Sequence, residues 1–494
     1  MSYNFCDEYG RPYVLIKEQE SRKRIEEKNI LAENVKAFCS IVDSISTSVG
    51  PFGADKAIVS ADGEVIITND GATMLKEMDL ESTAMGRLIT QLSTAQDSEI
   101  GDGTTSVVII AAALLREAEL LNTRGMHPLK IIRGYEEALE IALKTVDRKS
   151  KALTSAEMRQ AMADVGRSTL SSKVISRSIE KYIDIAIEAV ESVEDARGEI
   201  NLEMIKVEGE TKTGESEIIR GVYLPKEFSH FQMRKSIDNA QIALLACPFE
   251  PPKIKVKHDL NVHGVEEFEK LSQYEKALFT EMVETIKRSG ATVVLCQWGF
   301  DDEANSLLLQ AGISAVRWVG AQELEMVAVH CGAQIISRFE DLTAESLGTG
   351  SVKEKHGTIR VENPQKGKAV TILVRGGTQA IIEETKRSIQ DVLCTVRNIK
   401  KDRKLVQGAG AIDLECANAI FEALPGSLGS AYGRALQELP MALARNMGED
   451  PIARIAQVQS EEVWEGAFSK KHQYILATQT AKSIIRIDDV IGTQ

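Results

Sequence analysis

Helical patterning occupies both ends of this chain, whereas its middle alternates strands with helices. Near the start, apolar residues from Leu31 to Val49 recur at steps of four and three, which predicts a helix over about 24–49 that ends at Gly50-Pro51. From about 218 to 374, β-branched runs alternate with helical segments, as in an α/β domain. This pattern suggests an architecture in which an α/β region is nested between two helical regions.

Local patterns predict individual elements in the first part of the chain. An Asp-Gly turn between residues 57–60 and 65–68 predicts a β-hairpin, because each flanking run is short and β-branched. A second long helix is expected directly after residues 101–104 and should end near Gly125. The first part of the chain is therefore expected to be mainly helical.

The middle and the end of the chain have sequence patterns that differ from those of the first part. Residues 251–275 are charged and amphipathic without a clear strand, so a solvated helical insertion and an ordinary surface helix remain alternatives. Residues 484–491 have the pattern of a terminal strand. Strands of the middle region are expected over 241–249, 292–298, 314–319 and 367–376.

The composition of the chain indicates its cellular compartment and disfavours some classes of binding partner. The chain has 494 residues, enough to bury several cores without disulfides or a structural metal. Its formal net charge of −14, with no local basic patch, disfavours nucleic acid and anionic membrane surfaces as partners. No apolar run approaches the length of a membrane span, and the seven dispersed cysteines lack Cys-x-x-Cys spacing. We therefore expect a cytoplasmic protein with reduced thiols.

Three glycine-containing turns are candidates for binding an anion. They are residues 47–53, 101–106 and 408–411. Glycines let backbone amides approach an anion closely, and the helix expected after the second turn adds unsatisfied donors and the positive end of its dipole. The threonines and the serine of that turn add hydroxyl donors. The alternative interpretation of the second turn is an ordinary helix capped by Asp102.

Carboxylates near these turns favour phosphate binding together with a metal ion. Asp102 lies within the second turn, and Mg²⁺ typically binds one or two protein carboxylates beside phosphate oxygens and water. Taken alone, Asp70 is a turn residue and Asp391 a surface acid. The sequence contains no G-x-x-x-x-G-K-[ST] segment, so a P-loop NTPase is not supported. The residues by themselves predict a Mg²⁺–nucleotide site, with ATP hydrolysis as one use of it.

Several of these segments together resemble one protein family, the group II chaperonins. TSVGPFGADK (47–56), TNDGATML (68–75) and SEIGDGTTSVVI (98–109) are similar to the nucleotide site of that family. The resemblance continues in the expected order over nearly the whole chain, with LPMALARNMGEDP (439–451) and IIRIDDVI (484–491) similar to the C-terminal half. Four further segments resemble the eukaryotic cytosolic chaperonin TRiC/CCT: DEYGRP (7–12), CPFEPPK (247–253), CQWGFDDEAN (296–305) and AVRWVG (315–320).

The resemblance implies a multidomain α and α/β protein with the group II chaperonin fold, which is similar to that of GroEL. A helical equatorial domain would bind ATP, a small intermediate domain would act as a hinge, and an α/β apical domain with a lid protrusion would bind clients. The implied ranges are 1–144 and 396–494 (equatorial), 145–212 and 365–395 (intermediate), and 213–364 (apical), with the protrusion near 250–276.

The resemblance also implies a role for each site residue. Asp102 would be the Mg²⁺ ligand, whereas Asp70 and Asp391 would orient or activate the attacking water. Glu465 and Lys471 would lie close to the base. The residues implied to contact the nucleotide, most of them at its phosphates, are Gly50, Pro51, Gly103, Thr104, Thr105, Ser106, Ser172, Lys173, Gly408, Ala409 and Gly410.

This sequence departs from the family pattern at several positions. Between Asp450 and Lys471 the family carries a longer segment with an Asp that contacts the ribose. Here a helix is expected to run through Ile455 and Val458 almost directly into Glu465, and the ribose Asp has no counterpart. Three single positions also differ: Ala409 replaces Gly, Asp413 replaces Glu, and Arg445 replaces an acid.

Three functional hypotheses follow. The leading one is an ATP-dependent chaperonin subunit that uses ATP/ADP and Mg²⁺ within a stacked double ring of eight-membered rings. Its partners would be seven other paralogous subunits and unfolded clients such as actin and tubulin, with no nucleic acid and no membrane. The second is a structural subunit of the same ring that binds nucleotide but hydrolyses it weakly, which the shortened segment favours. The third is a metabolic ATP-dependent enzyme, which the lid-like insertion disfavours.

Overall fold

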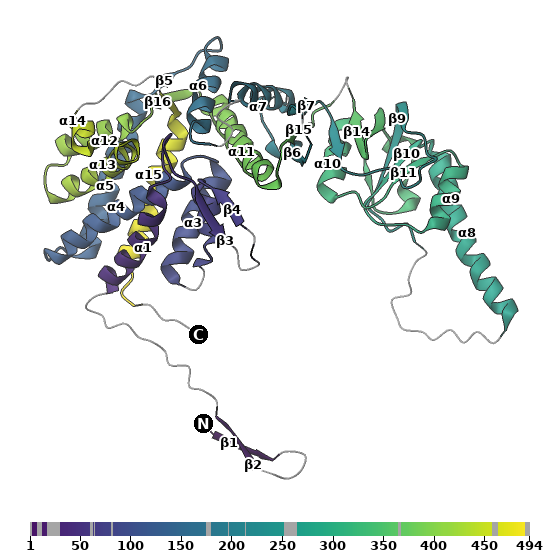
Figure 1. The fold of residues 1–494 in the computed structure, drawn as a ribbon, viewed down its shortest axis with the longest axis horizontal. Helices are drawn as coiled ribbons and strands as arrows, with labels where there is room; N and C mark the ends of the chain where they lie inside the picture. Colours follow the sequence, from purple (N-terminus) through teal and green to yellow (C-terminus); the bar gives the residue numbers. More distant parts are fainter. Residues whose placement is uncertain are drawn as a thin grey trace. The chain divides into compact units, whose positions relative to one another are not determined.

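The computed structural model describes most of the chain (Figure 1). Two compact units can be distinguished: the two ends of the chain form one (1–173 with 398–494), and the middle forms the other (174–397). The second unit is thus inserted between the two segments of the first, while the boundaries of three domains stay a prediction. The described residues are 2–6, 12–16, 30–59, 63, 65–80, 83–173, 179–195, 197–212, 214–250, 264–363, 367–456 and 463–489.

The first unit is mainly helical, as expected for both chain ends. Its described helices are α1 (Ile30–Ser46), α2 (Gly71–Glu77), α3 (Ala84–Glu99), α4 (Thr104–Thr123), α5 (Pro128–Lys149), α6 (Met158–Leu170), α12 (Ala411–Ala423), α13 (Ser427–Met447), α14 (Pro451–Ala456) and α15 (Ala467–Ile485). Helix α4 packs against α1, α13 and α15. Every residue from Val107 to Leu115 is buried, because this apolar helix is enclosed by others.

Short strands of the first unit lead directly into its helices. Strands β3 (Lys56–Val59) and β4 (Val65–Thr68) form the predicted antiparallel hairpin, and β4 ends immediately before α2. Strand β16 (Lys404–Gln407) pairs with β5 (Lys151–Ala152) and β17 (Trp464–Gly466), and it leads into the third glycine turn. At the N-terminus, β1 (Ser2–Cys6) and β2 (Pro12–Ile16) pair antiparallel.

The second unit is built on a large mixed sheet. Its strand order is β11-β10-β9-β13-β14-β8, with β12 beside β9. Strands β9, β10 and β11 run parallel and carry the predicted α/β alternation, whereas β13 and β14 are antiparallel. The strands are β8 (Val222–Leu224), β9 (Ser236–Leu245), β10 (Val293–Cys296), β11 (Ser314–Val316), β12 (Ile335–Ile336), β13 (Gly348–Lys355) and β14 (Thr358–Glu362).

A smaller sheet and several helices complete the described part of the second unit. Strand β15 (Val370–Arg375) pairs in parallel with β6 (Ile205–Glu210) and antiparallel with β7 (Glu217–Ile219), and α7 (Ile179–Val193) packs against β15. Helix α11 (Gln379–Asp402) begins in the second unit and ends in the first. Helices α9 (Asp302–Gln310) and α10 (Ala321–Cys331) follow β10 and β11.

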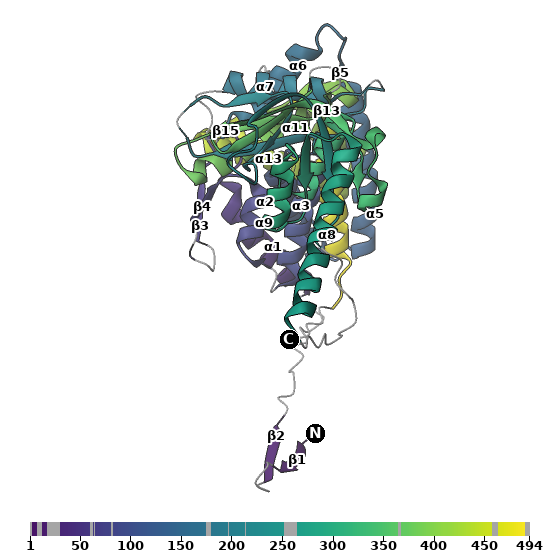
Figure 2. The same ribbon diagram turned by 90° about the vertical axis from the view of Figure 1, so that its right-hand side faces the viewer.

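Helix α8 (Val265–Ser289) corresponds to the predicted insertion. It extends past the strands of its own unit (Figures 1 and 2), and its first turns expose Val265, Phe268 and Tyr274. Residues 265–276 are therefore helical, as both alternatives expect, and the lid protrusion near 250–276 stays a prediction. Residues 251–263 of the expected protrusion lie outside the described residues.

One sequence-based expectation was wrong, and another can be followed only in part. Residues 484–491 do not begin as a strand: Ile484 and Ile485 end α15, because both are buried in the helical core and that packing overrides their β-branched propensity. Of the helix expected to run through Ile455 and Val458 almost directly into Glu465, the structure describes α14 as far as Ala456, and Glu465 itself lies in β17. Val458 and residues 490–491 lie outside the described part of the chain.

Candidate nucleotide site

The N-termini of α2 and α4 meet in the first unit. The hydroxyl of Thr104, the first residue of α4, donates a hydrogen bond to Oδ1 of Asp70, the N-cap of α2, over 3.0 Å. The two helix ends are in close contact, since a Cβ on Gly71 would lie 2.5 Å from Oγ1 of Thr105. Two positive helix ends are thereby brought to one place, an arrangement that favours bound anions.

Helix α4 begins in a way that leaves its first amides available. Its N-cap, Gly103, has φ of 76° and forms no side-chain cap, and the first internal bond runs from the Val107 amide to the Gly103 carbonyl. Any Cβ on Gly103 would overlap the side-chain amide of Gln473, so only glycine fits this left-handed position. The amides of Thr104, Thr105 and Ser106 therefore have no partner within the helix. The alternative of an Asp102 cap is not the geometry found.

Asp70 is a buried carboxylate that is held ionised. Its Oδ2 accepts hydrogen bonds from the amide and the hydroxyl of Thr73, at 2.9 and 2.8 Å. Burial would raise the pKa of Asp70, but the charge of Lys173 and the hydrogen bonds from Thr73 and Thr104 outweigh it and lower the pKa. Asp70 is thus more than a turn residue: it is a fixed negative charge between two helix ends.

Asp102 has the opposite electrostatic character. Its Oδ1 accepts a hydrogen bond from the Gly103 amide over 2.7 Å. Burial raises its pKa, and the nearby charge of Asp70 acts in the same direction, against the lowering effects of the Gly103 amide, Lys173 and Lys470. A carboxylate whose ionised form is disfavoured by its surroundings is suited to a cation that enters with a ligand.

Lys173 links these acids electrostatically, and the neighbouring Ser172 is held to the same region. The charge of Lys173 lowers the pKa of Asp70 and opposes the raised pKa of Asp102 and of Asp97, a carboxyl on α3. The side-chain amide of Asn69 donates to the Ser172 carbonyl. The structure therefore places both predicted residues of this segment beside the α2 and α4 ends.

The first and third glycine turns both pack against α13. Gly50 has φ of 86°, and a Cβ there would lie 2.5 Å from Leu443. Gly410 has φ of 82°, and a Cβ there would lie 2.8 Å from Pro440, one helical turn earlier. Asn446 of the same helix donates to the carbonyls of Ser46 and Val49 and so holds the turn that contains Gly50 and Pro51.

Ala409, which stands where the family has Gly, adopts a strained backbone conformation. Ala409 has φ of 53°, a left-handed conformation that glycine adopts more readily than alanine. The turn nevertheless closes, because the Ala411 amide donates to the Gly408 carbonyl over 3.0 Å. The third turn thus keeps its backbone form despite the replacement.

Glu465 lies beside the third turn within a buried charge cluster. A Cβ on Gly408 would lie 2.7 Å from its Oε1, so the carboxylate lies directly on that glycine. The ammonium of Lys470 lies 3.2 Å from Oε2 of Glu465 and 3.0 Å from Oδ2 of Asp413, whose other oxygen accepts from Tyr474 over 2.7 Å. Burial raises the pKa of Glu465, partly opposed by Lys470.

Lys471 pairs with a carboxylate of α5. Its ammonium lies 2.6 Å from Oδ1 of Asp147, which Lys404 also contacts at 3.2 Å. The residue that meets Glu465 is its neighbour Lys470. A base contact of Lys471 stays a prediction.

Sequence reasoning missed two residues of this region. The first is Lys470, which is adjacent to the predicted Lys471. Neighbouring residues of a helix project about 100° apart, so these two lysines cannot share one partner. Gln473 lies against Gly103, and its buried Oε1 has no hydrogen-bond partner. Its signal was the spacing: Gln473 is three residues after Lys470 and faces the same side of α15.

Asp391 lies on α11 in the second unit. It is buried, and the Thr395 hydroxyl donates to its backbone carbonyl over 2.8 Å. Its interpretation as a solvated surface acid is wrong, since the carboxyl-bearing residue is only 9% exposed. Its action on the attacking water stays a prediction, because it belongs to the other unit.

The residues present fit a nucleotide that carries its own Mg²⁺. Gly50, Gly103 and Gly410 all adopt left-handed conformations, which glycine-containing turns use to direct backbone amides at an anion. Within the described residues, no three His, Cys, Asp or Glu side chains form a metal-binding group. A single carboxylate such as Asp102 is nevertheless sufficient for Mg²⁺ that keeps phosphate and water ligands.

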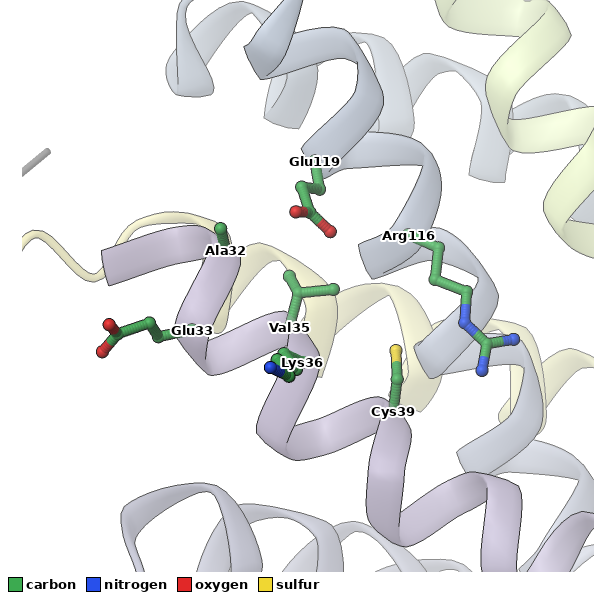
Figure 3. Close-up of a pocket in the computed structure, with 7 residues that line it drawn as sticks. All are labelled: Ala32, Glu33, Val35, Lys36, Cys39, Arg116 and Glu119. Atoms are coloured by element: carbon green, nitrogen blue, oxygen red, sulfur yellow. The ribbon is translucent and has the colours of Figure 1, made fainter. Parts of the chain in front are cut away.

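A separate hollow lies between α1 and α4 (Figure 3). It encloses about 440 Å³, and the Cys39 thiol on α1 and the Arg116 guanidinium on α4 both border it. It contains none of the predicted site residues. Its lining residues are Ala32, Glu33, Val35, Lys36, Cys39, Arg116 and Glu119.

Comparison with known proteins agrees with the fold. Residues 41–462 match the TCP-1/cpn60 chaperonin family, and the chain belongs to that family. Among the described segments, no helix is both long and apolar enough to cross a bilayer. The multidomain α and α/β fold class expected from the sequence is confirmed.

Individual relatives refine this assignment. The chain is 42% identical to T-complex protein 1 subunit epsilon of Encephalitozoon cuniculi over 531 residues, covering 100% of this chain and 99% of the relative. It is 34% and 32% identical to thermosome subunits alpha and beta of Aeropyrum pernix, covering 98% of this chain in each case. The resemblance to TRiC/CCT is thus confirmed and is to its epsilon subunit. The chain is a chaperonin subunit of a multi-subunit ring, from a family whose members are ATPases in general.

Proposed function

We propose that this chain is an ATP-hydrolysing subunit of a cytoplasmic double-ring chaperonin and that its first unit holds the nucleotide. The observation that carries the proposal is the junction of α2 and α4, where Asp70 accepts a 3.0 Å hydrogen bond from Thr104 beside the uncapped start of α4. Fixed amides and a fixed carboxylate at one place are what phosphoryl transfer needs, since its catalysis is mainly positioning and electrostatics.

The phosphates would lie on the backbone amides of three turns. The start of α4 supplies Gly103, Thr104, Thr105 and Ser106, and the turn at Gly50 and Pro51 lies against α13. The base would lie toward Glu465. The remaining contacts of the proposed nucleotide are Ser172, Lys173, Gly408, Ala409, Gly410 and Lys471.

Asp102 would hold the metal ion. Mg²⁺ bound there would neutralise phosphate charge. Asp102 is suited to this role, because its raised pKa means that the surrounding groups do not fully stabilise its negative charge. Asp70 and Asp391 would orient the attacking water, Asp70 as a carboxylate already ionised at neutral pH.

The assembly and the clients are also proposals. The ring partners would be seven other paralogous subunits, and the clients would be unfolded proteins such as actin and tubulin. Similarity to T-complex protein 1 subunit epsilon over the full chain supports a ring of mixed subunits. Gel filtration of the native complex tests this proposal against a small metabolic enzyme, which would elute as a monomer or small oligomer.

Substitution of Asp102 tests the nucleotide site. Asp102→Asn keeps an oxygen for the Gly103 amide but removes the charge, so it should raise the thermal midpoint of the nucleotide-free chain. The same variant should lose most of the extra ATP affinity that Mg²⁺ gives the native chain in a calorimetric titration. Unchanged Mg²⁺ dependence of binding would show that Asp102 is not the metal ligand.

A second candidate function is a ring subunit that binds nucleotide but hydrolyses it weakly. The short connection from the end of α14 at Ala456 to the start of β17 at Trp464 favours it, because the ribose-reading Asp of the family has no counterpart there. The retained Asp70, Asp102 and Asp391 favour hydrolysis. Direct measurement of phosphate release distinguishes the two.

A further inference from the structure

Two exposed tryptophans lie at one edge of the large sheet, in the second unit. Trp298 follows β10 and Trp318 follows β11, and because these strands are parallel their carboxyl ends lie side by side. Trp298 is 48% exposed and Trp318 is 58% exposed. Exposed tryptophans that lie next to each other, rather than singly, are typical of interaction sites, where Trp is enriched.

The backbone and neighbouring groups fix both tryptophans in place. The indole N–H of Trp298 donates to the Ala246 carbonyl over 2.9 Å, at the end of β9. The ring of Trp318 covers Gly299 so closely that a Cβ at this glycine would overlap it. The Trp318 amide also donates to the Trp298 carbonyl over 3.4 Å, which ties the two residues to each other.

The backbone at Trp318 is unusual for a bulky residue. Its φ of 61° lies in the left-handed region, which side chains with a Cβ adopt rarely and at a cost in free energy. In this conformation the indole lies against Gly299 and stays 58% exposed. The sheet edge therefore presents two rigid aromatic faces that lose little side-chain entropy when a ligand binds.

Three acidic side chains follow Trp298 closely in the chain. Asp301, Asp302 and Glu303 begin α9, directly after Phe300, and all three are exposed. The positive charge of Arg317 compensates these three negative charges only in part. Its guanidinium lies 3.9 Å from the carboxylate of Asp302, whose side chain is 97% exposed. Acids at a helix N-terminus also complement the helix dipole, but the dipole does not explain the tryptophans beside them.

We propose that this surface, here called the tryptophan edge (Trp298, Trp318, Asp301, Asp302 and Glu303), binds a lysine- or arginine-bearing segment of another polypeptide. The indole faces attract cations through their π electrons, and the carboxylates add charge complementarity. An apolar partner would leave the three acids beside it without compensation. The tryptophan edge lies in the second unit, so this proposal is independent of the nucleotide site in the first.

The test uses the full-length chain and a fluorescein-labelled short peptide of alternating lysine and glycine, followed by anisotropy. The native chain should bind this peptide, and binding should weaken as salt is raised. A peptide with glutamate in place of lysine should not bind. Equal binding of both peptides would overturn the proposal in favour of apolar docking.

Three variants separate the tryptophan edge from the general acidity of the chain. Trp318→Gly removes the ring, relieves the left-handed strain and keeps every charge, and it should weaken lysine-peptide binding about five- to tenfold. Asp302→Asn should weaken it as well. Asp238→Asn is the matched control, since Asp238 is also an exposed acid in a loose pair, 3.6 Å from Lys353, and it should change nothing.

The outcomes are decisive in either direction. Native affinity in Trp318→Gly, or equal losses in Asp302→Asn and Asp238→Asn, would overturn the proposal and assign binding to the net charge of −14. A second readout locates the peptide directly: Trp464→Phe leaves Trp298 and Trp318 as the only tryptophans, and their emission should change when peptide is added. Unchanged emission at saturating peptide would also overturn it.

Discussion

The hydroxyl of Thr104 donates a 3.0 Å hydrogen bond to Oδ1 of Asp70 and so joins the first residue of α4 to the N-cap of α2. This bond has two consequences. It satisfies an oxygen of a carboxylate that is only 9% exposed, and it helps to lower the pKa of Asp70 against the effect of burial. One side chain thus supports both the local fold and the charge state of the site.

Thr104→Val should make the chain less stable and more sensitive to acid. The variant leaves Oδ1 of Asp70 without this donor, which should cost about 1–3 kcal/mol. A lowered carboxyl pKa contributes stability that is lost as pH falls through the folded-state value, so raising this pKa should move the loss to higher pH. Thermal midpoints measured from neutral pH downward check this.

A control variant separates the carboxylate from the hydroxyl. Thr90→Val removes a half-buried hydroxyl that donates only to the Leu75 carbonyl, at 3.5 Å. Its midpoint should follow the pH dependence of the native chain. If Thr104→Val follows it too, the hydrogen bond to Asp70 does not set the pKa of that carboxyl.

Lys470→Met should destabilise the first unit strongly. Lys470 is almost fully buried between Asp413 and Glu465, so its removal would leave two carboxylates without their cation. Breaking a buried pair from one side typically costs about 3–5 kcal/mol. The neighbouring Lys471→Met is the matched control, because its partner Asp147 is 49% exposed and the loss should stay below about 1 kcal/mol. Similar unfolding midpoints for both variants would contradict the structural role assigned to Lys470.

Much of the fold could be predicted from the sequence, because its signals are local. Each signal involves only residues that are close in the sequence. Examples are the apolar stripe from Leu31 to Val49, the glycine before α4 and the turn between β3 and β4. The strand predicted at Ile484 and Ile485 was wrong for the opposite reason. Their helical conformation in α15 depends on burial against helices that are distant in the sequence, and the local sequence pattern contains no information about that burial.

The site was predictable in its residue types but not in its pairings. Asp70, Asp102 and the glycines follow from the turns and from family resemblance. The pairing of Lys470 with Glu465 and of Lys471 with Asp147 depends on the orientation of α15, and only tertiary packing determines that orientation. The contact between Gln473 and Gly103 likewise joins residues far apart in the sequence.

Discrimination at the ribose should be nearly absent. Residues 451–471 contain no Asp, and the family resemblance places the ribose-contacting Asp in this segment. A charge-assisted hydrogen bond from such a carboxylate is worth about 1.5–3 kcal/mol, or roughly ten- to hundredfold in affinity. ATP and its 2′,3′-dideoxy analogue should therefore bind with similar affinity in a direct titration of the isolated subunit. Tenfold or greater preference for ATP would mean that another residue reads the ribose.

Asp391→Ala should separate hydrolysis from binding. Asp391 would act on the attacking water and not on the phosphates, so the variant should keep nucleotide affinity close to that of the native chain. The matched control is Asp402→Ala, at the far end of the same helix, which should keep both binding and hydrolysis. Loss of ATP binding in Asp391→Ala would contradict the role assigned to Asp391.

Phosphate release from this subunit alone distinguishes an ATPase from a subunit that only binds nucleotide. Rings are assembled with the partner subunits, whose own sites are inactivated by substitution, and phosphate is measured under saturating ATP and Mg²⁺. We expect steady release from rings that carry the native chain and release at background level from rings that carry Asp391→Ala. Background release from the native chain, with ATP shown to be bound, would contradict hydrolysis here and establish the weakly hydrolysing subunit instead.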